Sequence, residues 1–144
     1  MSAPTKPLPR IDADSAPFWE AAAEGRLVGQ RCGSCDSWRW PPREHCPECH
    51  AATPVWHELP GTGSIVGLVV VHRPMDPAFA DEIPLALIHV VLDGTDDKGV
   101  LQSTLQQGEW EHARVGSRVA VQFTPLHDDV VLPTFTLLEL EKEI

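Results

Sequence analysis

The sequence predicts a mainly β fold in which a short helix and a small metal-binding module precede a five-stranded barrel. Two Cys-x2-Cys pairs lie between positions 32 and 49, and helix signals precede them in the stretch DSAPFWEAAAEG. After position 55, Val/Ile/Leu runs alternate with Gly, Pro and Asp, as in a small all-β domain. We therefore expect a flexible N-terminus at residues 1–13, a helix with a ribbon at 14–54, and a barrel at 55–144.

The composition sets limits on the class of protein. The 144 residues are 42% hydrophobic, enough to bury a core without disulfides. A net charge of -10 disfavours a general polyanion partner. The apolar runs are too short to span a membrane, and the Pro-rich N-terminus lacks the apolar stretch of a secretory signal. We therefore expect a cytoplasmic protein with reduced thiols.

The expected helix begins after the Asp-Ser pair, which can cap it, and Pro17 suits its first turn. Gly25 suits the position beyond its end. So short a helix is marginal alone and should dock through Phe18 and Trp19. The docking site is either this chain itself or a partner subunit.

The barrel prediction rests on five apolar runs separated by turn residues. Gly67 falls inside the first run, where a bend or bulge is expected. Five strands with a bent first strand are typical of the OB-fold. The default for His89, in the apolar run LALIHVVL, is a hydrogen-bonded core position. The predicted strands are Ser64–Val71, Leu85–Leu92, Val100–Gln106, Arg118–Thr124 and Thr134–Leu140.

All four cysteines, Cys32, Cys35, Cys46 and Cys49, fall in the two Cys-x2-Cys pairs. Two such knuckles supply the four thiolates of a closed tetrahedral zinc site, in which the ion is structural. Iron fits the same ligands, so the choice of metal stays open. A disulfide framework is disfavoured without an export signal, and a redox Cys-x2-Cys needs only one pair.

The order of motifs resembles a known family. The Phe-Trp helix, RCGSC, WPPREHCPEC, LPGTGSIVGLVVVHRP and LPTFTLLEL are similar to the acyl-CoA-associated zinc-ribbon plus OB-fold family, long catalogued as a domain of unknown function. The resemblance implies a rubredoxin-like zinc ribbon and an accessory subunit in a hetero-oligomer with a thiolase-like enzyme. Such enzymes include acyltransferases, thiolases and side-chain aldolases of steroid breakdown, and some members accompany acyl-CoA hydratases. His50 stands where Gly is commoner in the family.

The residue chemistry agrees with a chain that has no activity alone. No nucleophile elbow or phosphate loop is present, and no cysteine is left over for acyl transfer. Trp38, Arg39, Trp40 and Arg43 are candidates to bind a coenzyme A moiety, or else they pack the ribbon against the barrel. Nucleic-acid binding is the alternative for an OB-fold, but the predicted central strands carry neither Arg nor an aromatic ring.

Overall fold

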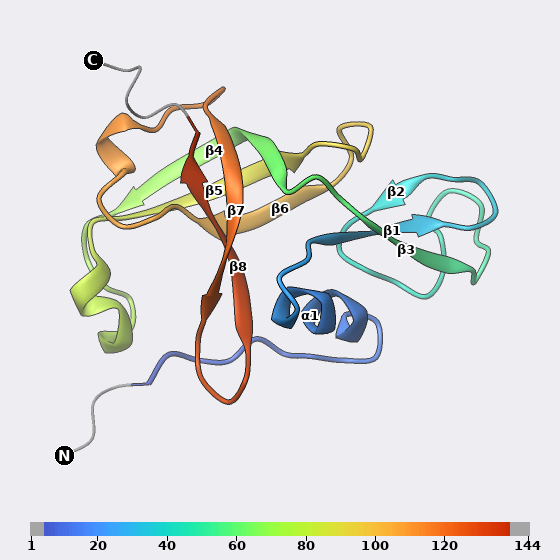
Figure 1. The fold of residues 1–144 in the computed structure, drawn as a ribbon, viewed down its shortest axis with the longest axis horizontal. Coiled ribbons are helices and arrows are strands. Elements are labelled where there is room, and N and C mark those ends of the chain that lie inside the picture. Colours follow the sequence, from blue (N-terminus) through green and yellow to red (C-terminus); the bar gives the residue numbers. More distant parts are fainter. Residues whose placement is uncertain (1–4, 139–144) are drawn as a thin grey trace.

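The computed structural model describes residues 5–138 and shows a helix and two antiparallel sheets (Figure 1). One short α-helix, α1 (Ala16–Ala23), precedes all strands, and 3-10 helices span Pro77–Glu82 and Trp110–His112. None of the helices in this described part is long and apolar enough to cross a membrane. The strands are β1 (Val28–Cys32), β2 (Trp38–Arg39), β3 (Pro54–Glu58), β4 (Thr62–Val71), β5 (Leu85–Leu92), β6 (Val100–Thr104), β7 (Arg118–Pro125) and β8 (Val131–Leu137).

The first sheet has the order β2-β1-β3 and forms the ribbon. β3 pairs with β1 over five residues, from Val28 opposite Glu58 to Cys32 opposite Pro54. The strands β2 and β3 were not predicted from the sequence. β2 has two residues and β3 begins at a proline, so neither carries a strand pattern of its own.

The second sheet has the order β6-β5-β4-β7-β8 and curls into a nearly closed barrel. A single parallel bridge between Leu105 and Phe135 joins its two edges. All five predicted strands are present, and the register shifts between Ile65 and Gly67, which confirms the expected bulge. β8 starts three residues before the predicted strand, and the end of that predicted strand lies outside the described residues.

The barrel core is built from the inward-facing residues of alternate strand positions. Ile88, Val90, Val119 and Phe135 have no exposed surface. Because Ile88 and Val90 point inward, His89 between them points outward and is exposed. The expectation of a core histidine is therefore wrong, since alternation along β5 outweighs the apolar neighbours in sequence.

Helix α1 docks on its own chain. Phe18 is 3% exposed, and its ring lies 4.8 Å from that of Trp40 and 5.2 Å from that of Trp19. Phe18 therefore belongs to the core of its own chain, and its expected role at a partner interface stays a prediction. Trp19 is only partly buried, so its role at an interface stays a prediction.

The N-terminal segment contacts the barrel from Lys6 onward. The Lys6 ammonium pairs with Glu82 and lies 5.4 Å from the ring centroid of Phe79. The Lys6 carbonyl oxygen bonds to Nε2 of His127 at 2.8 Å. Lys6 therefore contacts the barrel, and the flexibility expected for residues 1–13, of which residues 1–4 lie outside the described part, stays a prediction.

Candidate metal centre

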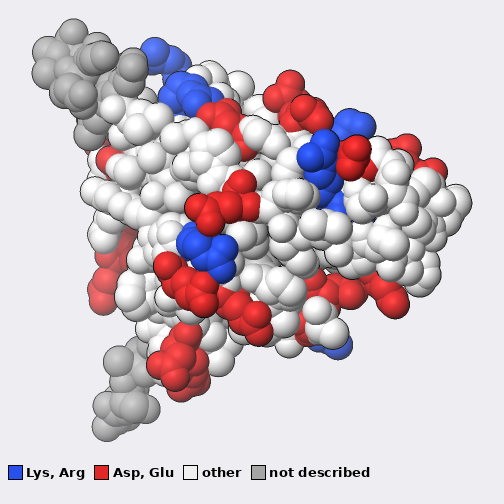
Figure 2. Space-filling model, turned by 45° about the vertical axis from the view of Figure 1, so that its right-hand side comes forward, with Lys and Arg blue, Asp and Glu red and all other residues white. Residues whose placement is uncertain are grey.

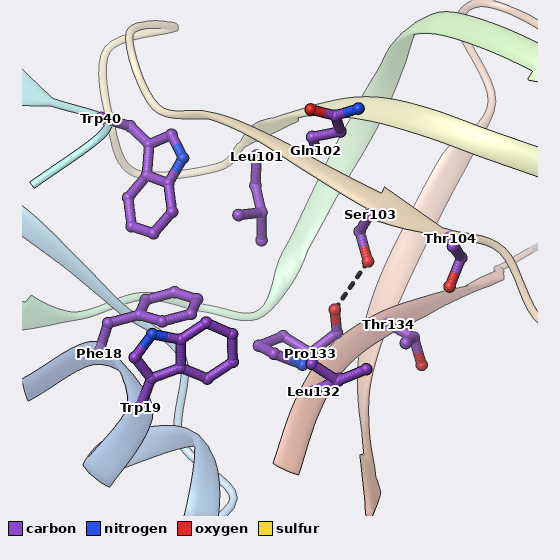
Figure 3. A pocket seen from close by; sticks show the side chains of 10 residues that line it. All are labelled: Phe18, Trp19, Trp40, Leu101, Gln102, Ser103, Thr104, Leu132, Pro133 and Thr134. Atoms are coloured by element: carbon purple, nitrogen blue, oxygen red, sulfur yellow. Dashed lines mark hydrogen bonds between the residues drawn. The ribbon is translucent and has the colours of Figure 1, made fainter. Parts of the chain in front are cut away.

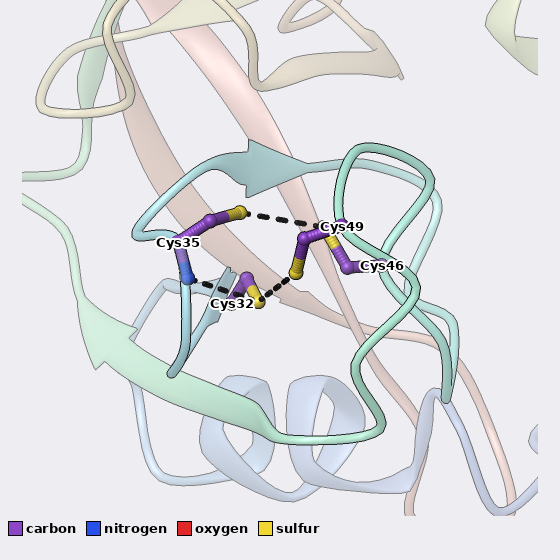
Figure 4. Close-up of side chains that lie close together, drawn as sticks. All are labelled: Cys32, Cys35, Cys46 and Cys49. Carbon is purple, nitrogen blue, oxygen red and sulfur yellow. Dashed lines mark hydrogen bonds between the residues drawn. The ribbon is translucent and has the colours of Figure 1, made fainter.

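The two Cys-x2-Cys pairs fold into matching turns that face each other (Figure 4). The N–H of Asp36 bonds to the carbonyl of Cys32, and the N–H of His50 bonds to the carbonyl of Cys46, both at 2.9 Å. Asp36 and His50 each follow the second cysteine of a pair and have φ values of 64° and 67°. Glycine adopts this left-handed conformation without strain, which explains why a glycine is commoner than a histidine at position 50 in the resembling family.

The sulfur atoms have the spacing of a tetrahedral site. All four Sγ atoms lie within 4.8 Å of one another. Cys32 and Cys49 are 3.6 Å apart, as are Cys35 and Cys46. Zinc–sulfur bonds of about 2.3 Å at tetrahedral angles place neighbouring sulfurs about 3.8 Å apart. The cysteines are free thiols, and their spacing fits one metal ion and not a disulfide framework.

Backbone amides point at two of the sulfurs. The N–H groups of Cys35 and Ser34 bond to Sγ of Cys32 at 3.5 and 3.4 Å, and they lower the pKa of Cys32 to about 7. The N–H of Cys49 and the hydroxyl of Ser37 lower the pKa of Cys46 to about 5. These donors favour thiolates, the form that binds metal.

The cluster does not favour four thiolates by itself. The Ala51 N–H lowers the pKa of Cys49, but desolvation and the sulfurs of Cys32, Cys35 and Cys46 outweigh it and raise this pKa to about 11. Four negative sulfurs at these distances repel one another unless a cation lies between them. The arrangement therefore fits a divalent ion with four thiolate ligands.

A buried polar network supports the segment between the two knuckles. Arg39 is 7% exposed and donates from Nε to Oε1 of Gln30 at 2.6 Å and from Nη2 to the Arg43 carbonyl at 2.9 Å. The Arg43 N–H donates to the same Gln30 oxygen at 2.8 Å. Arg39 is thus buried inside the ribbon with its Nη1 unpaired among the described residues, and its expected role in binding coenzyme A stays a prediction. The hydrogen bond between Gln30 and Arg39 was not predicted from the sequence, because no motif in the sequence indicates this contact.

The other candidate ligand residues do not converge on one pocket. Trp38 lies 5.7 Å from the ring of His57 and 5.1 Å from the guanidinium carbon of Arg31, whereas Trp40 packs against α1. Both tryptophans are half-buried, as the packing alternative expects. Arg43 alone of the four is exposed.

Among residues 5–138, the cysteine cluster is the one group of three or more His, Cys, Asp or Glu side chains close enough to share a metal ion. None of the seven histidines of the chain joins this cluster.

Fold and site together define a four-cysteine zinc ribbon followed by an OB-fold barrel. Two family models match the chain: the ChsH2 rubredoxin-like zinc ribbon domain at residues 19–55 and the ChsH2 C-terminal OB-fold domain at residues 56–124. The chain belongs to this ChsH2 family, also called DUF35.

Two solved structures and a curated relative are similar to the chain. A structure titled "Ltp2-ChsH2(DUF35) aldolase" matches with a TM-score of 0.80 and 32% identity, over 90% of this chain and 98% of that one. A DUF35 protein of unknown function from Sulfolobus solfataricus shares the fold at 12% identity and a TM-score of 0.59, over 87% of this chain and 85% of that one. A probable enoyl-CoA hydratase alpha subunit from Thermomonospora curvata is 32% identical over 90% of this chain, which spans 39% of that relative's length.

Proposed function

We propose that this chain is a non-catalytic subunit that assembles with a thiolase-like acyl-CoA enzyme, with an aldolase as the first candidate. The observation that carries the proposal is the similarity to the chain in the Ltp2-ChsH2 aldolase structure, which extends over nearly the whole of both chains. The catalytic subunit would bring the nucleophile and the acid and base groups. Its substrate class is an acyl-CoA thioester from lipid or steroid breakdown.

A hydratase is the second candidate partner. The relative from Thermomonospora curvata carries a matching region in a longer polypeptide named as a probable enoyl-CoA hydratase subunit. This observation favours a chain that works beside acyl-CoA chemistry, whichever enzyme supplies it.

Nucleic-acid binding is the weaker alternative. Single-stranded nucleic acid needs a basic groove with stacking aromatic rings. The strands β5 and β6 carry no Lys, Arg or aromatic residue. On the face drawn in Figure 2, acidic groups are scattered among a few cationic ones and no basic stripe is visible.

We propose one zinc ion as the resident metal, held by Cys32, Cys35, Cys46 and Cys49. With all four positions taken by sulfur, the ion would supply folding energy and no Lewis-acid chemistry. A cytoplasmic location belongs to the same proposal, because thiols stay reduced there. Elemental analysis of the intact protein that finds iron instead of zinc would contradict this choice.

The proposal is tested by purifying the tagged chain from its native host and identifying what co-elutes by mass spectrometry. We expect a thiolase-like or hydratase-like protein in fixed stoichiometry. That protein should turn over an acyl-CoA substrate faster with this chain than without it, and this chain alone should turn over none. Thioester turnover by the purified chain alone, or a catalytic protein indifferent to its presence, would refute the proposal.

A further inference from the structure

Backbone pairing between β6 and β8 is confined to one end of the seam where these two strands meet. At one end the Gln106 N–H donates to the Phe135 carbonyl at 2.8 Å, next to the bridge that closes the barrel. Two residues before Phe135 in β8 stands Pro133, which has no N–H to continue this pairing. Its carbonyl accepts a hydrogen bond from the Ser103 hydroxyl at 2.7 Å instead. The seam therefore stops pairing at Pro133.

The hydrogen-bonding pattern of β6 leaves backbone groups pointing into this seam. The Leu92 N–H bonds to the Gly99 carbonyl at 2.8 Å, and the Leu105 N–H bonds to the Ala86 carbonyl at 3.1 Å. Along an antiparallel pair of strands, every second residue bonds to the neighbouring strand through its N–H and C=O. Between these two ends of β6, the residues that bond to β5 in this way are therefore those at positions 101 and 103. The N–H and C=O of Gln102 therefore face away from β5, and within residues 5–138 no backbone partner takes them.

An apolar cavity of about 290 Å³ lies along the same seam (Figure 3). Trp19 and Trp40 border it on the ribbon and helix side, and Leu101, Leu132 and Pro133 border it on the barrel side. None of its ten lining residues is ionisable, although the chain carries a net charge of -10. An uncharged apolar group complements this cavity, and a charged one does not.

We propose that the β6 edge, Val100–Thr104, docks an extended apolar segment of the catalytic partner, which adds to the barrel as a further strand. The backbone of this segment pairs with the N–H and C=O of Gln102, and one of its apolar side chains fills the cavity between Trp19 and Trp40. A small apolar ligand would fill the cavity but leave the Gln102 backbone unpaired, so the two observations together favour a polypeptide. This inference rests on the proposed function and adds the surface through which the partner is held.

The test uses the variant Gln102→Pro, which removes the backbone N–H of residue 102. This N–H makes no hydrogen bond to β5, so the variant leaves the pairing of β6 with β5 in place. The matched control is Glu58→Pro on β3. The Leu59 N–H bonds to the Leu27 carbonyl at 2.8 Å, so the neighbouring Glu58 N–H also points away from its paired strand. A second variant, Trp19→Glu, places a charge at the cavity without touching the strand. Zinc content and circular dichroism verify that each variant folds.

Affinity for the co-purifying catalytic subunit is measured by titration calorimetry, and exchange of the Gln102 amide is followed in the wild-type complex. We expect Gln102→Pro and Trp19→Glu each to weaken binding at least tenfold, Glu58→Pro to leave it unchanged, and the Gln102 amide to exchange more slowly in the complex.

If both seam variants bind like wild type, the docking edge is refuted while the proposed function stands. If wild type binds no catalytic subunit, both are refuted. If the isolated chain is dimeric and its Gln102 amide is already protected, a second copy occupies the edge and the inference is wrong.

Discussion

Cys46 and Cys49 are both expected ligands, but their surroundings predict different consequences when each is replaced by serine. Cys46 is 1% exposed, and its Sγ accepts the Glu48 N–H at 3.3 Å and lies 3.5 Å from the Ser37 hydroxyl. Cys49 is exposed at the outer side of the cluster. Cys46→Ser therefore disturbs a buried ligand that accepts several hydrogen bonds, whereas Cys49→Ser disturbs an exposed ligand that accepts the Ala51 N–H.

The magnitudes follow from the four-thiolate geometry. Structural zinc binds with an apparent free energy of about 10–16 kcal/mol, so one ligand of four is worth roughly 3 kcal/mol. Such a loss lowers zinc affinity about 100-fold. The lost hydrogen bonds at Cys46 add about 1 kcal/mol, a further factor of about five in affinity. We therefore expect Cys46→Ser to weaken zinc binding about fivefold more than Cys49→Ser.

Competition with a chromophoric chelator at neutral pH measures both affinities, and amide exchange in β1 and β3 reports whether the ribbon stays folded. Ser34→Ala is a suitable control, because it changes a neighbouring side chain and leaves all four sulfurs and their backbone donors in place. Wild-type zinc affinity in Cys46→Ser would refute the four-thiolate site. Equal losses in the two serine variants would refute the role assigned to the hydrogen bonds.

The ion pair between Asp93 and Arg118 gives a pH-dependent prediction. The Arg118 guanidinium, helped by the Thr62 hydroxyl, lowers the pKa of Asp93 to about 2. The stabilisation is therefore complete above the ordinary carboxyl pKa of 3.8 and is lost as the pH falls toward 2. Because both side chains are more than a third exposed, solvent screening limits the effect to about 1 kcal/mol. Urea unfolding should show that deficit in Asp93→Asn at pH 7 and none near pH 2, and a deficit independent of pH would contradict the assignment. The exposed Arg43 remains the candidate for a coenzyme A phosphate. Arg43→Glu should raise the Michaelis constant of the assembled enzyme several-fold while Arg73→Glu does not, and equal constants in both would remove Arg43 from the site.

The metal cluster and the barrel strands were predictable because their signals are local. The spacing within Cys32-x2-Cys35 fixes a knuckle from a few consecutive residues, and period-two alternation marks a half-buried strand by itself. The bulge in β4 was likewise predictable from Gly67, a glycine inside a single strand.

The unpredicted features depend on contacts between distant positions. The bond from Arg39 to Gln30 joins residues of different strands, and neither residue type indicates a buried partner by its neighbours. Phe18 had two possible docking surfaces, and only the tertiary fold shows that Trp40 of its own chain covers it. The end of backbone pairing along the seam depends on Pro133 lying opposite β6, which no local pattern encodes.

The ribbon and the docking edge are linked through Trp40. This residue follows directly after β2, the strand that lies between the two Cys-x2-Cys pairs in the sequence. The two residues of β2 pair with Gln30 and Arg31 of β1. Its ring packs on Phe18 and forms one wall of the seam cavity. The ribbon thus places an aromatic side chain at a site that contains none of the four cysteines.

Removing the metal should therefore open that cavity while the barrel stays folded. We expect chelation to shift the tryptophan emission to longer wavelength as Trp40 becomes exposed, and to abolish binding of the catalytic subunit over the same range of chelator concentration. Exchange in β5, whose Ile88 and Val90 are fully buried, should be unchanged. The Trp40→Phe variant identifies the share of the emission shift that belongs to this residue. If the metal-free chain still binds its partner with wild-type affinity, the ribbon does not shape the docking edge and the link through Trp40 is wrong.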